Sequence, residues 1–354
     1  MKIIINNRIV IINFIEEMTP RVTVLMPVYN GEKHLKEAIE SILNQTFNDF
    51  EFLIINDGST DDSEKIILSY SDPRIHLFNQ ENQGLSNTLN KGIKLSSGEF
   101  IARMDQDDIS LSSRLDEQIK FMDANPDVGI CGTYAILINE RGEGVGRAVY
   151  PSEHEDIKAQ LLFSSSVVHP SVVFRKNIFI NHNLEYTSGK SEDYDLWVRA
   201  VRVTKLVNIN KFLFKYRADS GYSNILQKQA YLSSAHQIIK KNILELDNFS
   251  ESDMVIYEKM YDPECIPDKK FLKTAFSLLN KIRQANFCKN IYNKESLDLI
   301  FIIKWFYICV RIKKVKMIIL PELWKYTIIL FFRLKISRKI NLIKIIQAKL
   351  FGKI

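Results

Sequence analysis

Apolar and amphipathic stretches alternate along the first third of the chain. Short apolar runs, which predict buried strands, cover residues 22–28, 51–56, 74–78 and 100–104. Apolar side chains three and four residues apart, which predict helices, occupy residues 31–45, 61–70 and 85–95. Because parallel strands need helical crossovers, this order predicts an α/β fold with a mostly parallel central sheet and helices on both faces.

The pattern becomes less regular beyond this part of the chain. Further strands are predicted at residues 128–139, 171–175 and 205–216, and further helices at residues 152–163 and 193–201. The glycines of residues 141–146 predict a hairpin turn, because no helix follows them to hold a phosphate. We therefore expect three segments, which are an N-terminal extension (1–20), an α/β domain (21–222) and a mainly helical, basic C-terminal region (223–354).

The composition indicates a globular, intracellular type of protein. Of the 354 residues, 46% are hydrophobic and 25% are charged, which excludes a disordered chain. The four cysteines lie far apart, with no C-x-x-C pair and no cluster with histidine. This spacing argues against a structural zinc site and favours reduced, buried thiols.

The first 18 residues are apolar but interrupted by Asn6, Asn7, Arg8 and Asn13. They end in acidic rather than small residues, so they fit neither an export signal nor a membrane span. Met18, which directly precedes the first clear strand, is a candidate for the natural start of the chain. Residues 1–20 are therefore expected to be an extension outside the α/β domain.

Positive charge is concentrated at the C-terminal end. Residues 301–354 contain 13 Lys or Arg and one acid, a net of about +12, whereas the whole chain carries +6. No run of 18 uncharged apolar residues occurs there, so basic amphipathic helices on an anionic membrane surface fit better than a span. Each basic residue near such a surface contributes roughly 1 kcal/mol to the free energy of binding to the membrane. A helical bundle with a solvated basic face, or a tail docked on the α/β domain, is the alternative; nucleic acid is not expected, because no binding motif is present.

Polar clusters follow three of the predicted strands. Pro27, Tyr29 and Asn30 end the first strand, and Asp57 ends the second. The carboxyl ends of parallel strands meet at one edge of a sheet, which is where ligands bind. Turn formation is the alternative for Asn30. Acids such as Asp61 that begin the next helix are explained by the helix dipole, but Asp57 is not.

The fourth strand ends in three acids, Asp105, Asp107 and Asp108. Such carboxylates repel one another and resist burial, so something must offset their charge. For Asp108 the alternative is a cap on the following predicted helix, which contains Leu115, Ile119 and Met122. Asp105 and Asp107, on an extended segment with one residue between them, can face one hard cation. The chain contains neither a P-loop nor G-x-G-x-x-G, so a diphosphate would be held through Mn²⁺ or Mg²⁺ rather than by a glycine-rich helix start.

Five segments occur in the order typical of a known family: VLMPVYN (24–30), SILNQTF (41–47), DFEFLIINDGSTDDS (49–63), GLSNTLNKG (84–92) and GEFIARMDQDD (98–108). Together they resemble family 2 glycosyltransferases of the bacterial surface-polysaccharide type. The resemblance implies the GT-A fold, a Rossmann-like sheet, an inverting mechanism and a nucleotide-diphospho-sugar donor.

The resemblance also implies roles for individual residues. The residues matched to the nucleotide-sugar site are Pro27, Tyr29 and Asn30 (base and ribose), Asp57 (base, usually uracil), Asp105 (ribose and sugar), Asn90 and Arg103 (pocket lining). Asp107 matches the ligand of Mn²⁺ or Mg²⁺. The chain departs from the usual pattern at Asn56, where relatives often have Asp, and at Leu89, where they often have Arg.

The segment SEDYDLW (191–197) offers three acids at the start of a helix. The helix dipole alone explains such acids, but the resemblance places the catalytic base there. Asp193 is our choice for the base, with Glu192 as orienter or stand-in and Asp195 as a structural residue. His169 matches a residue on the acceptor side of the site, although a lone histidine is often structural.

The sequence therefore predicts an inverting, metal-dependent hexosyltransferase that uses a UDP-sugar. We expect its acceptor to be a glycan or lipid-linked glycan of cell-surface polysaccharide biosynthesis, and its location to be cytoplasmic, on the inner face of the membrane. A non-catalytic scaffold with a degenerate pocket is one alternative. A nucleotidyltransferase is another, but it would carry a glycine-rich basic loop after the first strand. A processive synthase would need membrane spans and a QxxRW motif.

Overall fold

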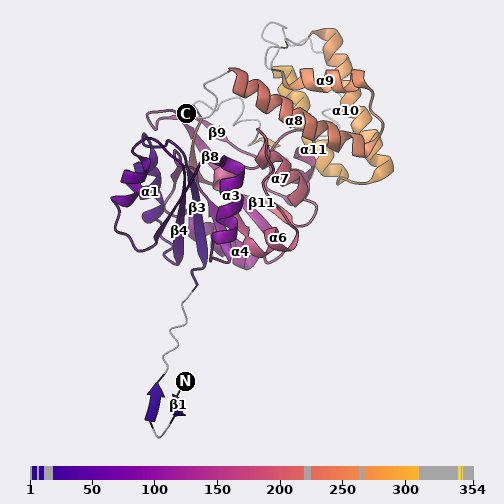
Figure 1. The fold of residues 1–354 in the computed structure, drawn as a ribbon. Coiled ribbons are helices and arrows are strands. Elements are labelled where there is room, and N and C mark those ends of the chain that lie inside the picture. Colours follow the sequence, from indigo (N-terminus) through magenta and orange to yellow (C-terminus); the bar gives the residue numbers. More distant parts are fainter. Residues whose placement is uncertain are drawn as a thin grey trace.

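The structure is a computed structural model. It describes residues 2–5, 8–11, 19–218, 225–262, 265, 268–310, 342–343 and 345. Its centre is a nine-stranded sheet covered by helices, with a second group of helices beside it (Figure 1). A separate two-stranded antiparallel sheet near the N-terminus joins β1 (Lys2–Ile5) to β2 (Arg8–Ile11).

The central sheet has the strand order β5-β4-β3-β6-β10-β8-β11-β7, and β9 pairs with β8 outside this path. Its strands are β3 (Val22–Val28), β4 (Phe50–Asp57), β5 (Ile75–Gln80), β6 (Phe100–Arg103), β7 (Ile109–Ser110), β8 (Val128–Ile138), β9 (Gly144–Ala148), β10 (Val173–Arg175) and β11 (Lys205–Arg217). The pairings make β3, β4, β5, β6, β8 and β11 run in one direction, while β7, β9 and β10 run in the other. The predicted mostly parallel sheet is thus confirmed.

Both faces of the sheet are buried, which explains the continuous apolar runs of the strands. All seven residues of β3 are buried. Val24 and Met26 belong to one hydrophobic cluster, and Leu25 between them belongs to the other. The helices around the sheet are α1 (Leu35–Leu43), α2 (Ser63–Leu68), α3 (Leu85–Leu95), α4 (Arg114–Ala124), α5 (His154–Gln160), α6 (Lys176–Asn181) and α7 (Glu192–Ala200). A strand buried on both faces needs no polar alternation.

The helices after β11 pack directly on the α/β part. They are α8 (Ile225–Leu246), α9 (Glu251–Tyr261), α10 (Lys269–Lys289) and α11 (Lys294–Val310), and they lie beside α7 (Figure 1). Trp197 of α7 and Trp305 of α11 are fully buried in the same hydrophobic cluster. Lys304 is also buried, and its ammonium donates to the Ser164 hydroxyl at 3.0 Å. The helical C-terminal region predicted from the sequence is therefore present. Its buried side chains belong to the same hydrophobic cluster as those of the α/β part.

Two local differences from the sequence predictions have clear causes. Helix α1 begins at Leu35 rather than residue 31, because the preceding loop is bonded elsewhere: the Gly31 amide donates to the Ser63 hydroxyl at 2.9 Å. Asp108 does not cap α4, which begins at Arg114 with Ser113 in the N-cap position. The prediction that Asp108 caps that helix is wrong, because Asp108 is buried and accepts from the Arg217 amide.

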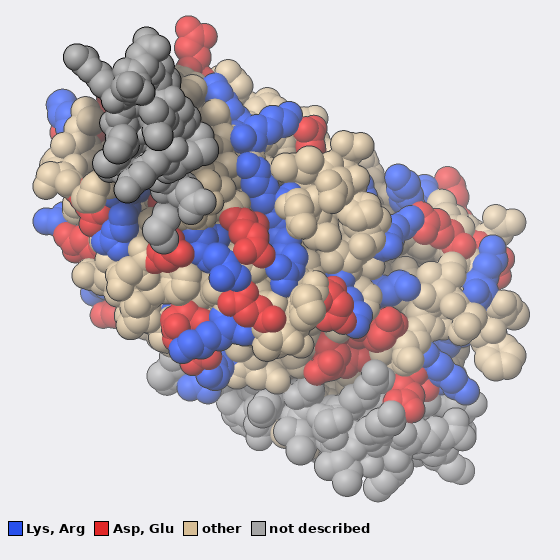
Figure 2. Space-filling view, turned by 90° about the horizontal axis from the view of Figure 1, so that it is seen from below, with Lys and Arg blue, Asp and Glu red and all other residues tan. Residues whose placement is uncertain are grey.

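Among the residues that the structure describes, no helix is long and apolar enough to cross a membrane. Lys and Arg are interspersed with Asp and Glu on the face shown in Figure 2. Of the 13 basic residues between 301 and 354, only Lys304 belongs to the described part. The predicted membrane-binding tail thus falls almost wholly outside the described residues.

Helix α3 approaches β3 so closely that only glycine fits at position 92. A Cβ atom there would lie 2.2 Å from Leu25 Cδ1. We expect Gly92→Ala to reduce the free energy of unfolding by about 1–3 kcal/mol, because overpacking outweighs the gain in helix propensity of about 1 kcal/mol. In a Leu25→Ala background, which itself costs about 2–5 kcal/mol, the same change should be neutral or stabilising. Urea unfolding of the four proteins measures this reversal, and equal effects in both backgrounds would contradict the contact.

Candidate active site

Three loops at the carboxyl ends of β3, β4 and β6 form one side of a cleft. A cavity of about 440 Å³ lies there, and Pro27, Tyr29, Asp57, Asp105 and Asp107 all line it. The side chain of Tyr29 is 49% exposed, so its ring is available to a ligand. The structure thus brings together five of the residues that the sequence assigned to the nucleotide-sugar and metal sites.

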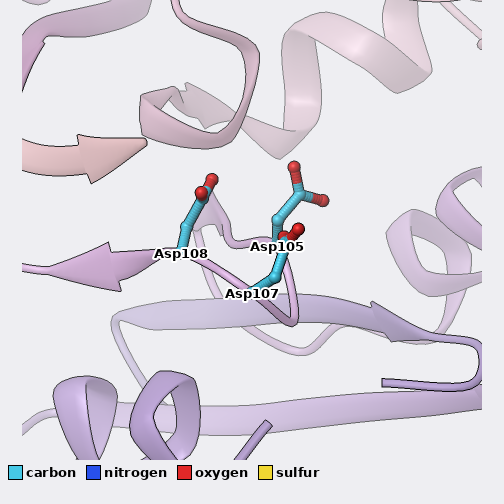
Figure 3. Close-up of side chains that lie close together, drawn as sticks. All are labelled: Asp105, Asp107 and Asp108. Atoms are coloured by element: carbon cyan, nitrogen blue, oxygen red, sulfur yellow. The ribbon is translucent and has the colours of Figure 1, made fainter. Parts of the chain in front are cut away.

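The three acids Asp105, Asp107 and Asp108 lie on the loop between β6 and β7, and their side chains point to the same side (Figure 3). One carboxylate oxygen from each of Asp105, Asp107 and Asp108 lies within 4.8 Å of the others. Asp108 is 1% exposed, and its Oδ2 has no hydrogen-bond partner among the described residues. A buried, unpartnered oxygen next to two further carboxylates is a donor set that suits a hard divalent cation.

Burial and mutual repulsion act on these acids. The pKa of Asp105 is raised by burial, with the Arg103 charge opposing the shift. The pKa of Asp108 is raised well above its usual value by burial and by the charges of Asp105 and Asp107. Both shifts mean that the ionised cluster is costly without added positive charge. The residues present therefore fit Mn²⁺ or Mg²⁺.

Three arginines surround the acid cluster from within the protein. Arg103 is 2% exposed and forms an ion pair with Asp105. Arg114 is fully buried, which lowers its pKa to about 9, and its Nη2 donates to the Arg103 carbonyl at 2.8 Å. Arg217 is 1% exposed, and its backbone amide donates to Asp108 Oδ1 at 2.7 Å. Of these three arginines, the sequence predicted only Arg103 as a site residue. Arg114 opens an amphipathic helix and Arg217 ends a strand, and both are weak signals in a sequence.

The middle residue of the acid motif connects the loop to the end of β3. The Tyr29 amide donates to Gln106 Oε1 at 2.8 Å, and Gln106 Nε2 donates to the Tyr29 carbonyl at 3.0 Å. A Cβ atom on Gly31 would lie 2.6 Å from the Gln106 amide, so glycine leaves the room for this clamp. The Asn30 side chain faces another loop, where its Oδ1 accepts from the Thr60 amide at 2.8 Å. Asn30 adopts a left-handed backbone with φ of 49°, which asparagine tolerates.

Asp57 is buried and already accepts three hydrogen bonds. Its Oδ1 accepts from Gln80 Nε2 at 2.6 Å and from the Gln83 amide at 2.9 Å. Its Oδ2 accepts from the Gly84 amide at 2.9 Å. Asp57 therefore shapes the loop that leads into α3. Its Oδ2 accepts one hydrogen bond and keeps further acceptor capacity, and Asp57 also lines the cavity.

A second cavity of about 450 Å³ adjoins the first. It shares Asp105 with it and is also lined by Arg103, His169, Glu192 and Asp193. Leu85 and Tyr216 line both cavities, so the cleft is continuous past the acid cluster. The structure thus places the predicted base on the opposite side of Asp105 from the predicted nucleotide site.

The two acids at the start of α7 both have raised pKa values. Burial and the neighbouring Glu192 charge raise the pKa of Asp193 to about 6. The pKa of Glu192 is raised as well, mainly by burial. Asp195, two residues along, instead accepts from the Thr187 hydroxyl at 3.0 Å and from Arg199 Nε at 2.9 Å. A carboxyl group with a pKa near neutrality can exchange protons at working pH, which suits Asp193 to acid–base chemistry.

His169 and Asn90 are both linked to Tyr186. His169 Nε2 lies 2.9 Å from the Tyr186 hydroxyl, and burial beside Arg103 holds the histidine pKa well below its usual value. The imidazole is thus neutral near pH 7. The Asn90 side chain donates to the Tyr186 carbonyl and accepts from the Tyr186 amide, both at 2.8 Å. Asn90 does not line the two cavities among the described residues, whereas His169 lines the second.

The protein thus combines an α/β fold with an acid-rich cleft at the carboxyl ends of its strands, and comparisons with known proteins identify its family. Residues 23–181 match the model described as Glycosyl transferase family 2. The chain is 36% identical over 202 residues to the O-antigen biosynthesis glycosyltransferase WbnJ of Escherichia coli, covering 55% of this chain and 79% of that protein. It is 35% identical over 223 residues to the uncharacterized glycosyltransferase MJ1057 of Methanocaldococcus jannaschii, covering 60% and 77%. The chain therefore belongs to glycosyltransferase family 2.

A solved structure confirms the fold class. The structure of S. aureus TarS 1–349 in complex with UDP-GlcNAc superimposes with a TM-score of 0.55, covering 82% of this chain and 88% of that one. The sequences are 16% identical, so the likeness shows the fold alone. The protein has the predicted GT-A fold, followed by a helical C-terminal region.

We expect Asp193→Asn to stabilise the protein at alkaline pH. The folded pKa of Asp193, about 6, lies above its ordinary value of 3.8. The wild type therefore loses stability as pH rises from 3.8 through about 6, and the uncharged amide does not. The gain in the free energy of unfolding should reach at most about 3 kcal/mol at pH 8 and largely vanish at pH 4. Urea unfolding at both pH values measures it.

Asp195→Asn is the matched control on the same helix. It removes a carboxylate bonded to Thr187 and Arg199, so it should not stabilise the protein at pH 8. A gain for Asp193→Asn that is the same at pH 4 and pH 8 would contradict the assigned pKa shift.

Proposed function

We propose that the protein is an inverting glycosyltransferase that moves a sugar from a UDP-sugar to a glycan or lipid-linked acceptor. The observation that carries the proposal is the continuous cleft in which the acid cluster lies between Tyr29 and Asp57 on one side and Asp193 on the other. A nucleotide diphosphate and an acceptor hydroxyl could meet at Asp105. UDP is preferred because TarS, which shares the fold, was solved with UDP-GlcNAc.

In this proposal the first cavity holds the nucleotide. The exposed Tyr29 ring and Pro27 contact the base and ribose, and Asp57 Oδ2 accepts a hydrogen bond from the base. Asp107 would be the principal ligand of Mn²⁺ or Mg²⁺, with Asp105 and Asp108 beside it. A cation held there would supply positive charge that stabilises the departing diphosphate. Leu89, at a position where relatives often have Arg, is buried in the hydrophobic core and supplies no such charge.

The second cavity holds the acceptor and the base. Asp193 removes the proton from the acceptor hydroxyl while the hydroxyl oxygen attacks the anomeric carbon from the face opposite the diphosphate. The bond from the anomeric carbon to the diphosphate oxygen breaks, and its electron pair leaves with the nucleotide. Burial and the Glu192 charge keep the pKa of Asp193 raised, and the neutral His169 can donate or accept a hydrogen bond on the acceptor side.

The biological setting follows from one named relative and from the charge of the chain. WbnJ is an O-antigen biosynthesis glycosyltransferase, which supports a role in cell-surface polysaccharide assembly. We propose that residues 21–222 carry the chemistry and that the basic part of residues 223–354 attaches the enzyme to the inner face of the membrane. The net charge of about +12 over residues 301–354 supports that attachment.

A non-catalytic scaffold and a nucleotidyltransferase are the competing functions. The raised pKa of Asp193 across the cleft from Asp107 argues against a scaffold, because binding alone needs no proton acceptor. The loop after β3 holds Tyr29 and Gly31 without a basic residue between them, which argues against nucleotidyl transfer. Release of UDP from a UDP-sugar distinguishes all three.

The donor site is tested by calorimetric titration of UDP with and without Mn²⁺. We expect Mn²⁺ to tighten UDP binding at least about tenfold in the wild type, and Asp107→Asn to abolish this gain, because removing a metal ligand or its supports costs about 10–100-fold. Asp116→Asn, which changes an acid on α4 that pairs with Lys120, is the control and should behave as wild type.

Each other result has a definite meaning. Equal binding of UDP with and without Mn²⁺ would show that Asp107 is not a metal ligand. Absence of UDP binding would direct the titration to GDP and dTDP. Absence of binding to all three nucleotides would favour the scaffold.

The base is tested by the pH dependence of UDP release from a UDP-sugar. Asp193 must be ionised to accept a proton, so the rate should fall as pH drops below about 6. Asp193→Asn should lower the rate by about 10²–10⁴-fold at pH 7.5, while Asp195→Asn should retain most of it. A wild-type rate that does not change between pH 5 and pH 8 would contradict this assignment.

A further inference from the structure

Arg217, the last residue of β11, connects four separate segments around the acid cluster. Its side chain is 1% exposed. Its backbone amide donates to Asp108 Oδ1 at 2.7 Å, and its Nε donates to the Asp107 carbonyl at 2.8 Å. Its Nη1 donates to the Asn139 carbonyl at 2.7 Å, and its Nη2 donates to Glu37 Oε2 at 2.8 Å. One residue thus joins the ends of β8 and β11 and helix α1 to the acid loop.

Two of these bonds act on the acids themselves. The bond to the Asp107 carbonyl fixes the peptide between Asp107 and Asp108, and so the direction in which both side chains leave the backbone. The bond to Asp108 Oδ1 occupies one oxygen and leaves Oδ2, which has no partner among the described residues. The backbone amide of residue 217 therefore binds one oxygen of Asp108, and the Arg217 side chain holds the adjoining Asp107 carbonyl.

The backbone around Arg217 supports the same arrangement. Strand β7, which directly follows the acids, pairs with β11 through Ser110 opposite Phe214 and Ile109 opposite Lys215. At the other end of the loop, the Met104 amide donates to the Leu25 carbonyl at 3.0 Å. The loop is thus fixed at both ends, and its middle is held by the bonds between Gln106 and Tyr29 and by the bond from the Arg217 side chain to the Asp107 carbonyl.

We propose that Arg217 is a positioning residue for the divalent-cation site, and that it holds Asp107 and Asp108 in the geometry that binds the ion. This inference rests on the proposed function, because it assumes that Asp107 is a metal ligand. Three carboxylates that repel one another would otherwise move apart. A guanidinium with donors in a rigid fork can reach three acceptors at once, which the single ammonium of lysine cannot.

The test is the affinity of the full-length protein for Mn²⁺ alone, measured by electron paramagnetic resonance of the free ion. We expect Arg217→Lys to weaken Mn²⁺ binding by about 10–100-fold, the usual effect of losing a residue that orients a ligand. Binding of uridine, which has no phosphate and does not need the ion, should stay within about twofold of wild type. A general structural defect would weaken both, so the difference between the two ligands is the diagnostic.

Arg175→Lys is the matched control. Arg175 is another arginine at the end of a strand. Its side chain is 14% exposed, donates to the main-chain carbonyls of Val128 and Met122, and pairs with Glu99. It lies on β10, away from the residues lining the cleft among those described. Its replacement should lower the melting temperature about as much as Arg217→Lys does and leave Mn²⁺ binding unchanged.

A milder variant keeps the test decisive if Arg217→Lys does not fold. Glu37→Gln alters only the exposed partner of Arg217 Nη2, whose side chain is 52% exposed. It should weaken Mn²⁺ binding by about twofold to fivefold, since exposed ion pairs contribute little. Unchanged Mn²⁺ affinity in a folded Arg217→Lys, or in Glu37→Gln when the other variant is unfolded, would overturn the proposal. Absence of Mn²⁺ binding in the wild type would instead contradict the metal assignment on which it rests.

Discussion

The rest of the site depends on three buried arginines that hold the loop carrying three carboxylates. Asp105, Asp107 and Asp108 lie close together at the end of a fully buried strand, where their repulsion is costly. Arg103 acts by a direct ion pair with Asp105, whereas Arg114 supports the backbone of the loop from α4. Arg217 reaches the loop from the last strand of the sheet. Because each arginine comes from a different element, the acid cluster can form only when β6, α4 and β11 are all in place.

The arginines offset the negative charge of the three acids only in part, and the remaining negative charge makes the cleft suitable for a cation. One oxygen of Asp108 keeps no partner among the described residues, and its pKa stays raised. On the other side of Asp105, Asp193 has a pKa of about 6, while the neighbouring imidazole of His169 is neutral. The acid cluster, which still lacks positive charge, therefore adjoins Asp193, which can take up a proton. A cation bound with an anionic diphosphate would balance the charge of the acid cluster without removing Asp193 as the proton acceptor.

The sequence predicted the elements well and the contacts between distant elements poorly. Helix α3 was predicted at residues 85–95 and lies there, because apolar spacing is a local signal. Helix α1 was predicted too long, because the Gly31 amide bonds to Ser63, 32 residues away. Arg217 was assigned no role, and its partners Asp107 and Glu37 lie 110 and 180 residues away. No periodicity or spacing can carry such information. The acid cluster was identified only because its three members are adjacent in the sequence.

Part of the candidate active site comes from elements that follow the residues matched by the family model. The match ends at residue 181, before α7 with its two acids and before β11 with Arg217. Helix α8 is also involved, because Ser191, directly before Glu192, donates its hydroxyl to the Tyr231 carbonyl at 3.1 Å. Tyr231 in turn lines the cavity that contains Asp193. The matched residues therefore hold the loops that carry Tyr29, Asp57 and the acid cluster, while α7 holds the two acids of the second cavity. The second cavity consequently depends on the packing of α8 against α7, which lies outside the matched residues.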